Sequence, residues 1–197
     1  ESSDETRTDI SKQVIQEEIK TADFHEAMNS VLDNIQTKAF THGIILDADL
    51  DDDFLVKGDQ EALAQFLYNL VDYAADNSLH HNEGRRVSLK SKPLGGTAYL
   101  KVAVANYCFN ADELNYLNTN DHSATNINMN LILIKELLGD IKATIAVKNK
   151  MSAKENIEGC EIEVIFQRYN QEATDKNITS VVKGTKREIL EAMRSEA

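Results

Sequence analysis

The stretch at residues 58–78, GDQEALAQFLYNLVDYAADNS, constrains the fold more than any other part of the chain. Its apolar residues recur at the three- and four-residue spacing of one helix face. They are Ala62, Leu63, Phe66, Leu67, Leu70, Val71 and Ala74. Asp59 is placed to cap this helix, because an Asp side chain accepts hydrogen bonds from the free N–H groups of the first turn. We therefore expect a core helix after Asp59, with Asn69 and Tyr73 one turn apart on a common face.

The rest of the chain alternates between patterns typical of helices and of strands. Asp23 can cap a helix that Gly43 ends. Its inward residues are expected to be Phe24, Ala27, Met28, Val31, Leu32, Ile35 and Phe40. Shorter helices are predicted over residues 112–117 and 129–138. Strands are predicted over residues 14–20, 44–50, 86–91, 99–105, 144–147 and 161–166, with Pro93, Gly95 and Gly96 in the turn between the third and the fourth.

This order of elements predicts an α+β fold. We expect a two-layer α/β sandwich, in which three helices cover one face of one mixed sheet. A chain of 197 residues, 42% of them hydrophobic, can bury one substantial core. Residues 1–12 are predicted to be a disordered start or the remnant of a linker, 13–168 the domain, and 169–197 a tail. A short amphipathic tail helix at 185–193 could pack on the domain, join a dimer or lead to a further domain.

The formal charge of −12 is concentrated near the start of the chain. Residues 1–61 hold 16 acidic and five basic residues, whereas the remainder holds 17 and 16. Such an acidic surface repels nucleic acid and anionic lipid and favours a basic patch on another protein, although it could also serve only for solubility. No apolar run is long enough to span a membrane, and no secretory signal opens the chain, so a cytoplasmic location is expected. Cys108 and Cys160 are expected to be buried, reduced thiols.

The opening motif resembles the first motif of the histidine kinase ATP-binding domain, the Bergerat-type (GHKL) family. That family reads G-D-x-x-x-L-x-Q-x-L-x-N-L-x-x-N-A-x-K-x-S at this place. The matching residues here are Gly58, Asp59, Leu63, Gln65, Leu67, Asn69, Leu70, Ala74 and Ser78. Two positions differ, since Tyr73 stands where the family has its magnesium-binding Asn and Asp76 stands where it has a Lys beside the phosphates.

The family's two later glycine motifs are also altered, and the resemblance covers about residues 14–167. In the adenine-binding motif D-x-G-x-G, Ala105 replaces the Asp, and Tyr107 and Phe109 replace the glycines. The phosphate-binding motif G-x-G-L-G-L has three asparagines in place of its glycines: Asn126, Asn128 and Asn130. Asn tolerates left-handed backbone, so the turn could survive while its side chains fill the space of a phosphate. Lys142 and Ala143 replace the Gly-Gly before the next strand.

These joint losses imply a degenerate, pseudokinase-like domain that lacks catalytic residues, metal and cofactor. The positions of the lost nucleotide site are Asn69, Tyr73, Asp76, Ala105, Tyr107, Phe109, Asn126, Asn128 and Asn130. The resemblance implies a protein-interaction or regulatory module of two-component signalling, whose partner is a histidine kinase, a receiver domain or a second copy. An alternative is the accessory docking domain of a histidine phosphotransferase, whose phospho-acceptor hairpin is absent from this sequence. A third is a rebuilt ATP site with Tyr73 and Tyr107 stacked on the base.

Other polar residues have simpler interpretations. His80 and His81 are expected to be exposed loop residues, since no partner spacing indicates a metal site. His25 is expected to lie on a helix surface, and the acidic run at 49–53 to form a solvated turn without the spacing of a calcium loop. Asn69 could satisfy a neighbouring backbone group. The decisive question is whether Tyr73, Tyr107 and Phe109 fill the former site or leave it open.

Overall fold

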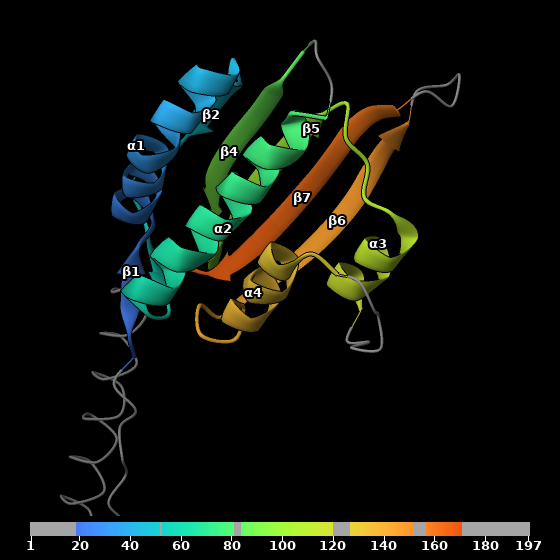
Figure 1. Cartoon of the computed structure of the whole chain (residues 1–197). Helices are drawn as coiled ribbons and strands as arrows, with labels where there is room; N and C mark the ends of the chain where they lie inside the picture. Colours follow the sequence, from blue (N-terminus) through green and yellow to red (C-terminus); the bar gives the residue numbers. More distant parts are fainter. Residues whose placement is uncertain (1–18, 52, 81–83, 120–126, 152–156, 171–197) are drawn as a thin grey trace, which may run out of the picture.

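Helices cover one face of a five-stranded sheet in the computed structural model, which describes residues 19–51, 53–80, 84–119, 127–151 and 157–170 (Figure 1). The described helices are α1 (Phe24–His42), α2 (Gln60–Ser78), α3 (Ala111–Asn118) and α4 (Met129–Leu137). The described strands are β1 (Thr21–Asp23), β2 (Ile45–Leu50), β3 (Leu55–Lys57), β4 (Arg86–Leu94), β5 (Thr97–Ala105), β6 (Ala143–Met151) and β7 (Ile157–Gln167).

The main sheet has the order β2-β4-β5-β7-β6 and is mixed, as predicted. Only its β2–β4 pair is parallel, whereas β4–β5, β5–β7 and β6–β7 are antiparallel. The helices α1, α2 and α4 lie over one face, and the short α3 lies beside the last strand, β6 (Figure 1). The predicted two-layer α+β class is therefore confirmed.

A second, two-stranded sheet of β1 and β3 was not predicted. The strand predicted at 14–20 is wrong where it can be checked, since Ile19 and Lys20 are not in a strand and β1 begins at Thr21; residues 14–18 lie outside the described residues. The predicted tail helix at 185–193 also lies outside them.

Both long helices begin at the predicted caps, Asp23 and Asp59, and α1 also ends at its predicted cap. Asp23 accepts from the N–H of Glu26, and Gly43 ends α1 with a left-handed φ of 65°. Phe40, expected inside, is 89% exposed. Ile35 and Ala39 take the inward positions of the last turns, and Phe40, one residue further, is rotated about 100° from Ala39 toward solvent.

The hairpin between β4 and β5 is tighter than predicted, because Pro93 lies within β4 opposite Ala98 and the turn consists of Gly95 and Gly96. Alternate residues of β4 point their backbone N–H toward β2, which ends at Leu50 opposite Ser91. At Pro93 no strand lies on that side, so the missing N–H leaves no ladder bond unmade.

Helix α2 is the centre of the core. It packs against α1, α4, β4 and β5. Its fully buried side chains include Leu63, Phe66, Leu67 and Leu70. Because these contacts hold α2 in place on several sides, they also fix the direction in which its polar side chains point.

Candidate functional site

Helix α2 points the two motif positions Asn69 and Tyr73 into the protein, where both side chains are buried. Gln65, one turn earlier, donates from Nε2 to Asn69 Oδ1 at 3.0 Å. Asn69 is therefore held by a side chain, not by the backbone group that the sequence suggested. Among the described residues, Asn69 Nδ2 is buried without a hydrogen-bond partner.

Three aromatic rings from the predicted site positions meet in the structure; we call Tyr73, Tyr107 and Phe109 the aromatic cluster. Tyr73 stacks on Phe109 with ring centroids 6.1 Å apart, and Tyr107 stands edge-on to both, at 6.3 Å from Tyr73 and 5.5 Å from Phe109. Tyr73 is 2% exposed and Phe109 3% exposed. Edge-to-face and stacked pairs of this kind add stabilisation beyond the burial of their area. The rings therefore fill the volume between α2 and the end of β5.

Glu113 of α3 ties the two tyrosines together. The hydroxyl oxygens of Tyr73 and Tyr107 are 2.8 Å apart, and they lie 3.4 Å and 3.3 Å from the two oxygens of the buried Glu113 carboxyl. Two hydroxyl protons serve these three contacts, so one tyrosine donates to the other while the second donates to Glu113. Asn110 N–H also donates to Glu113, and Glu113 N–H to the Asn110 side chain, as a capping box.

Glu113 was missed in the sequence. The available signal was the Asn-x-x-Glu spacing of residues 110–113 at the start of the predicted 112–117 helix, which indicates a capping box. What the spacing does not indicate is that the same carboxyl would turn inward to lie within hydrogen-bond distance of both tyrosine hydroxyls.

Burial keeps the tyrosine hydroxyls and the cysteine thiols of this region in their neutral forms. It raises the pKa of the Tyr73 hydroxyl far above its usual value and that of Tyr107 to about 12. It also raises the pKa of the Cys160 thiol to about 12 and that of Cys108 above its usual value. Both cysteines are free thiols, as predicted, but Cys108 is only half-buried, which corrects the expectation that both are buried.

The end of β5 brings Tyr107 and Phe109 to the cluster. Ala105 pairs with Gly159 on β7, and its methyl group offers no acceptor for an adenine amino group. Asn106 then takes a left-handed φ of 59°, which turns the chain out of the strand. Phe109 is fixed by Asn149 of β6, whose side chain accepts from Phe109 N–H at 2.9 Å and donates to Phe109 O at 2.8 Å.

The described asparagines of the third motif do not form the left-handed turn that the sequence left possible. Asn128 is the N-cap of α4, with φ −57° and ψ 134°, and its side chain accepts from Asn130 N–H at 2.8 Å. A cap residue needs extended backbone, so a left-handed residue would not serve at Asn128. Asn130 lies in the first turn of α4, and Asn126 lies outside the described residues.

Asp76 is not brought together with the aromatic cluster. Its carboxylate lies 2.7 Å from Lys38 Nζ on α1, and that ammonium is also 2.6 Å from Asp72. Asp76 is four residues after Asp72, so the two carboxylates lie on the same side of α2, where Lys38 of α1 contacts both. The charge that replaces the family's phosphate lysine thus joins the two long helices.

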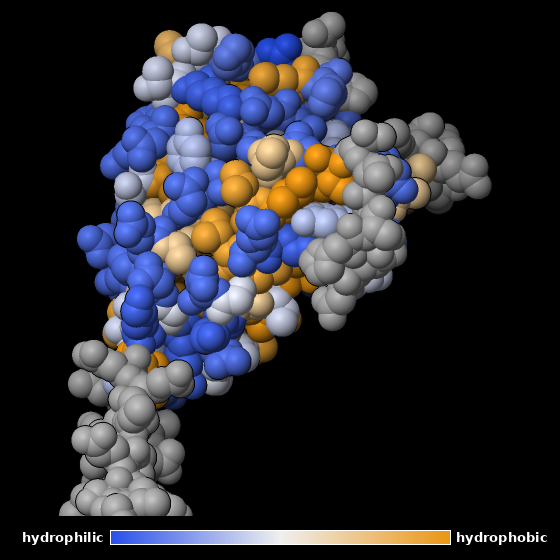
Figure 2. All heavy atoms as spheres, turned by 60° about the horizontal axis from the view of Figure 1, so that its bottom comes forward, coloured by the Kyte–Doolittle hydropathy of each residue, from blue (hydrophilic) through white to orange (hydrophobic). Residues whose placement is uncertain are grey.

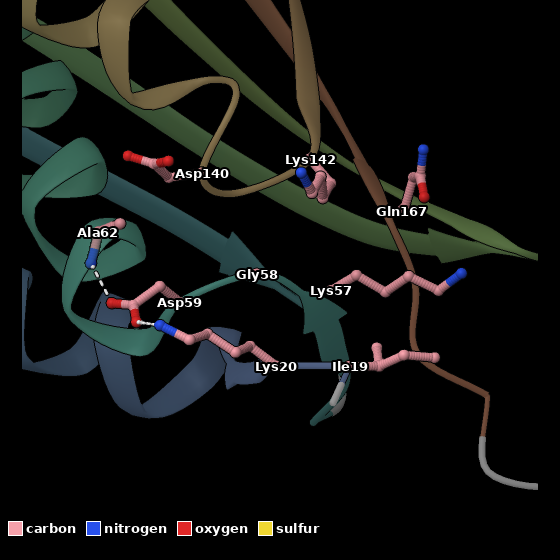
Figure 3. Close-up of a pocket in the computed structure, with 9 residues that line it drawn as sticks. All are labelled: Ile19, Lys20, Lys57, Gly58, Asp59, Ala62, Asp140, Lys142 and Gln167. Atoms are coloured by element: carbon pink, nitrogen blue, oxygen red, sulfur yellow. Dashed lines mark hydrogen bonds and ion pairs between the residues drawn. The ribbon is translucent and has the colours of Figure 1, made fainter. Parts of the chain in front are cut away.

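The beginning of the motif lines a separate hollow of about 660 Å³ (Figure 3). Asp59 caps α2 by accepting from Ala62 N–H at 3.1 Å and pairs with Lys20 at 2.9 Å. Gly58, with φ 142°, passes so close to the α4–β6 connection that an added Cβ would lie 2.7 Å from Ile141 Cα. Lys142, which replaces one of the family's glycines, keeps a left-handed φ of 49°.

The histidines that are described have ordinary surroundings. His25 lies 3.5 Å from Asp53, and the exposed His80 stacks on Tyr107 with ring centroids 5.9 Å apart. His81 and His122 lie outside the described residues. In the described part of the chain, no group of three or more His, Cys, Asp or Glu side chains is arranged to hold a metal ion. No described helix combines the length and apolarity needed to cross a bilayer.

Comparison with solved structures identifies the fold. The mycobacterial sensor histidine kinase MprB matches at a TM-score of 0.61 and 16% identity, over 78% of this chain and 100% of that chain. The nucleotide-free catalytic domain of histidine kinase ThkA matches at 0.62 and 15%, over 77% and 97%. ThkA solved in complex with the response regulator TrrA matches at 0.59 and 14%, over 77% and 42%.

No protein-family model matches the sequence, and no curated protein matches it either. The chain therefore has the fold of histidine kinase catalytic domains. At 14–16% sequence identity, the similarity shows the fold alone.

Proposed function

We propose that this chain is a histidine-kinase-type ATP-binding domain that has given up its nucleotide site and acts as a protein-interaction module in two-component signalling. The observation that carries the proposal is the aromatic cluster. Tyr73 and Phe109 are almost fully buried on each other, and the hydroxyls of Tyr73 and Tyr107 are bonded to one another and to Glu113. A nucleotide could enter only if this network opened.

The chemistry of the positions supports the same proposal. Magnesium prefers oxygen ligands such as the amide of the family's Asn, whereas the Tyr73 hydroxyl stays protonated because burial raises its pKa. Ala105 cannot accept from adenine, and Asp76 with Asp72 already neutralises Lys38. These features support a proposed domain that carries no catalytic residues and binds neither metal nor cofactor.

A protein partner fits the surface that remains. Seen from the end where α4 lies, a band of hydrophobic residues crosses an otherwise polar surface (Figure 2). Met129 and Leu133 of α4 are 65% and 37% exposed. Exposed apolar groups rimmed by polar ones are typical of protein contacts. The candidate partners are a histidine kinase, a receiver domain or a second copy, and the acidic charge opposes nucleic acid.

The test is titration of the chain with magnesium and ATP, followed by calorimetry and by the NMR signals of residues 73 and 107–109. We expect no saturable heat and no shift of these signals at ATP concentrations up to about 1 mM, which corresponds to a binding free energy weaker than about −4 kcal/mol. Saturable binding at micromolar concentration would overturn the proposal. ATP-dependent shifts confined to Tyr73 and Tyr107 would instead support a rebuilt site with the base stacked on these rings.

A further inference from the structure

The two edges of the main sheet differ in how their backbone groups are satisfied. At β6, the Asn118 side chain of α3 donates to Val147 O at 2.9 Å and accepts from Val147 N–H at 2.8 Å. An asparagine amide thereby takes the place of a neighbouring strand. The side chain of Asn149 of β6 forms a corresponding pair of bonds with the backbone of Phe109 and so ties that segment to this strand. An added strand is therefore obstructed at Val147, and sheet edges in monomeric proteins are usually obstructed.

The opposite edge, β2, has no such cover among the described residues. β2 is paired with β4 alone, and Ile45 N–H and Asp51 N–H donate to Arg85 O and Ser91 O of that neighbour. In a parallel pair, alternate residues bond to a given neighbour. The N–H and C=O groups of the intervening residues 46, 48 and 50 therefore point to the open side. No residue of β2 is buried, and β2 lies at the border of the sheet beside α1 (Figure 1).

The two faces of strand β2 carry different kinds of side chain. On the face away from the helices, Asp47 and Asp49 have side chains that are 61% and 70% exposed, although each has a cation of β4 within 4 Å, Arg86 and Lys90. On the helix side, Leu46 and Leu50 pack partly against the core. An added strand would lie about 4.8 Å away and align its own side chains with these residues.

The charges select the occupant of the edge. A second copy pairing antiparallel through β2 would bring Asp47 and Asp49 opposite the same residues of its partner, and like charges directly opposite destabilise a strand pair. A segment with alternate basic and apolar residues would place cations beside the aspartates and apolar side chains beside Leu46 and Leu50. We propose that β2 binds an extended basic segment of a partner protein by strand addition. This proposal rests on the proposed function and specifies its partner.

The test is amide hydrogen exchange of the whole chain with and without a peptide of alternating Lys and Val, about seven residues long to match β2 and its flank. When the free peptide concentration is about ten times its Kd, amide exchange at Leu46, Ala48 and Leu50 should slow about tenfold. Exchange at Asp47 and Asp49, whose N–H groups already bond to β4, should change little. A peptide of alternating Glu and Val, and a Lys-Val peptide N-methylated on its pairing side, should cause no slowing.

Two variants separate backbone pairing from charge. Ala48→Pro removes an outward N–H without touching the bonds to β4, so it should abolish the slowing at the neighbouring amides 46 and 50. Asp47→Asn with Asp49→Asn should weaken binding about tenfold or more, since two charge contacts are lost. The matched control, Asp33→Asn with Asp112→Asn, removes the same charge from exposed positions on α1 and α3 and should leave binding unchanged.

Equal slowing by the Glu-Val or the N-methylated peptide would overturn the proposal, as would unchanged binding by Ala48→Pro. Absence of slowing with any peptide would mean that the acidic edge only keeps other strands away. Slowing that rises with protein concentration without peptide would assign the edge to a second copy instead. Magnesium-ATP titration of the same sample keeps the two proposals apart, because saturable ATP binding contradicts the loss of the nucleotide site whatever the peptide does.

Discussion

The residues at the two ends of the Gly58–Ser78 motif differ in what they contact. At its start, Gly58 and Asp59 match the motif, and both have a role set by the backbone: Gly58 lies against the α4–β6 connection, and Asp59 caps α2, although its carboxylate also pairs with Lys20. Toward its end, Tyr73 and Asp76 differ from the residues of the motif that the sequence resembles, and both contact other side chains of the protein. Under the proposed function, the positions that backbone geometry requires match the motif, whereas the positions that only a ligand requires take part in packing.

The largest expected effect is that of Tyr73→Asn, which introduces the residue that the histidine kinase motif has at this position. We expect a loss of about 4 kcal/mol in the free energy of unfolding, because the ring is buried against Phe109 and Tyr107 and its removal leaves a cavity. Urea unfolding measures this loss. The matched control is Tyr68→Asn on the same helix, where the ring is 40% exposed and the loss should stay below about 1 kcal/mol. Similar losses in the two variants would contradict a packing role for Tyr73.

The retained end is tested by Gly58→Ala. We expect a loss of about 3 kcal/mol, since the methyl group would meet Ile141 Cα at 2.7 Å and Asp140 O at 2.9 Å, and since alanine resists the φ of 142°. Gly96→Ala is the control, because a Cβ there meets nothing within 4 Å and the residue has no left-handed φ. If Gly58→Ala unfolds at the same urea concentration as Gly96→Ala, backbone geometry is not the reason that Gly58 was kept.

The stability of the aromatic cluster should depend on pH in the alkaline range. Burial raises the pKa of Tyr107 from 10.0 to about 12, so the folded state favours the protonated hydroxyl. The resulting stabilisation is complete below the unfolded pKa and is lost as the pH rises from about 10 to about 12. Allowing for the half-exposed ring, we expect this hydroxyl to account for about 1.5 kcal/mol of the loss. Tyr107→Phe should flatten the pH dependence of unfolding by that amount, and an unchanged slope would contradict the burial of the hydroxyl.

The smallest predicted effect is a gain in stability at Lys142, near Gly58. A left-handed φ costs a non-glycine residue about 1–2 kcal/mol, so Lys142→Gly should stabilise the protein by about 1 kcal/mol. Lys92→Gly is the control, since it removes an exposed lysine within β4 and should destabilise by about 0.5–1 kcal/mol. Loss of stability in both variants would mean that the Lys142 side chain makes contacts that outweigh its strain.

The sequence predicted the fold where local chemistry decides it. Asp23, Gly43 and Asp59 marked helix ends correctly because capping depends on a few neighbouring residues. Phe40 and Pro93 were misplaced because their settings depend on where a helix face or a neighbouring strand stops, which is a property of the assembled sheet and helices. The pair of β1 and β3 was missed because strands of three residues carry almost no period.

In the candidate site, the sequence indicated which rings were available, and the structure brings Tyr73, Tyr107 and Phe109 together. It did not indicate the role of Glu113, because a polar residue in a short helix is ordinarily exposed. Asp76 was expected beside the former phosphate position, but Lys38, 38 residues earlier in the chain, pairs with it. Such partnerships between distant residues arise only from the fold and have no local signature.

Under the proposed function, the aromatic cluster also makes the loss of the nucleotide site difficult to reverse in evolution. Replacing Tyr73 alone leaves a cavity beside Tyr107 and Phe109, replacing Tyr107 alone removes one hydrogen-bond partner of both Tyr73 and Glu113, and replacing Phe109 alone removes the ring that stacks on Tyr73. Each single step back toward the family's residues thus lowers stability before any ligand can be gained. The free energy of unfolding of a typical protein is only about 5–15 kcal/mol, so a lineage would have to change several positions nearly at once. The packing therefore makes the change hard to reverse.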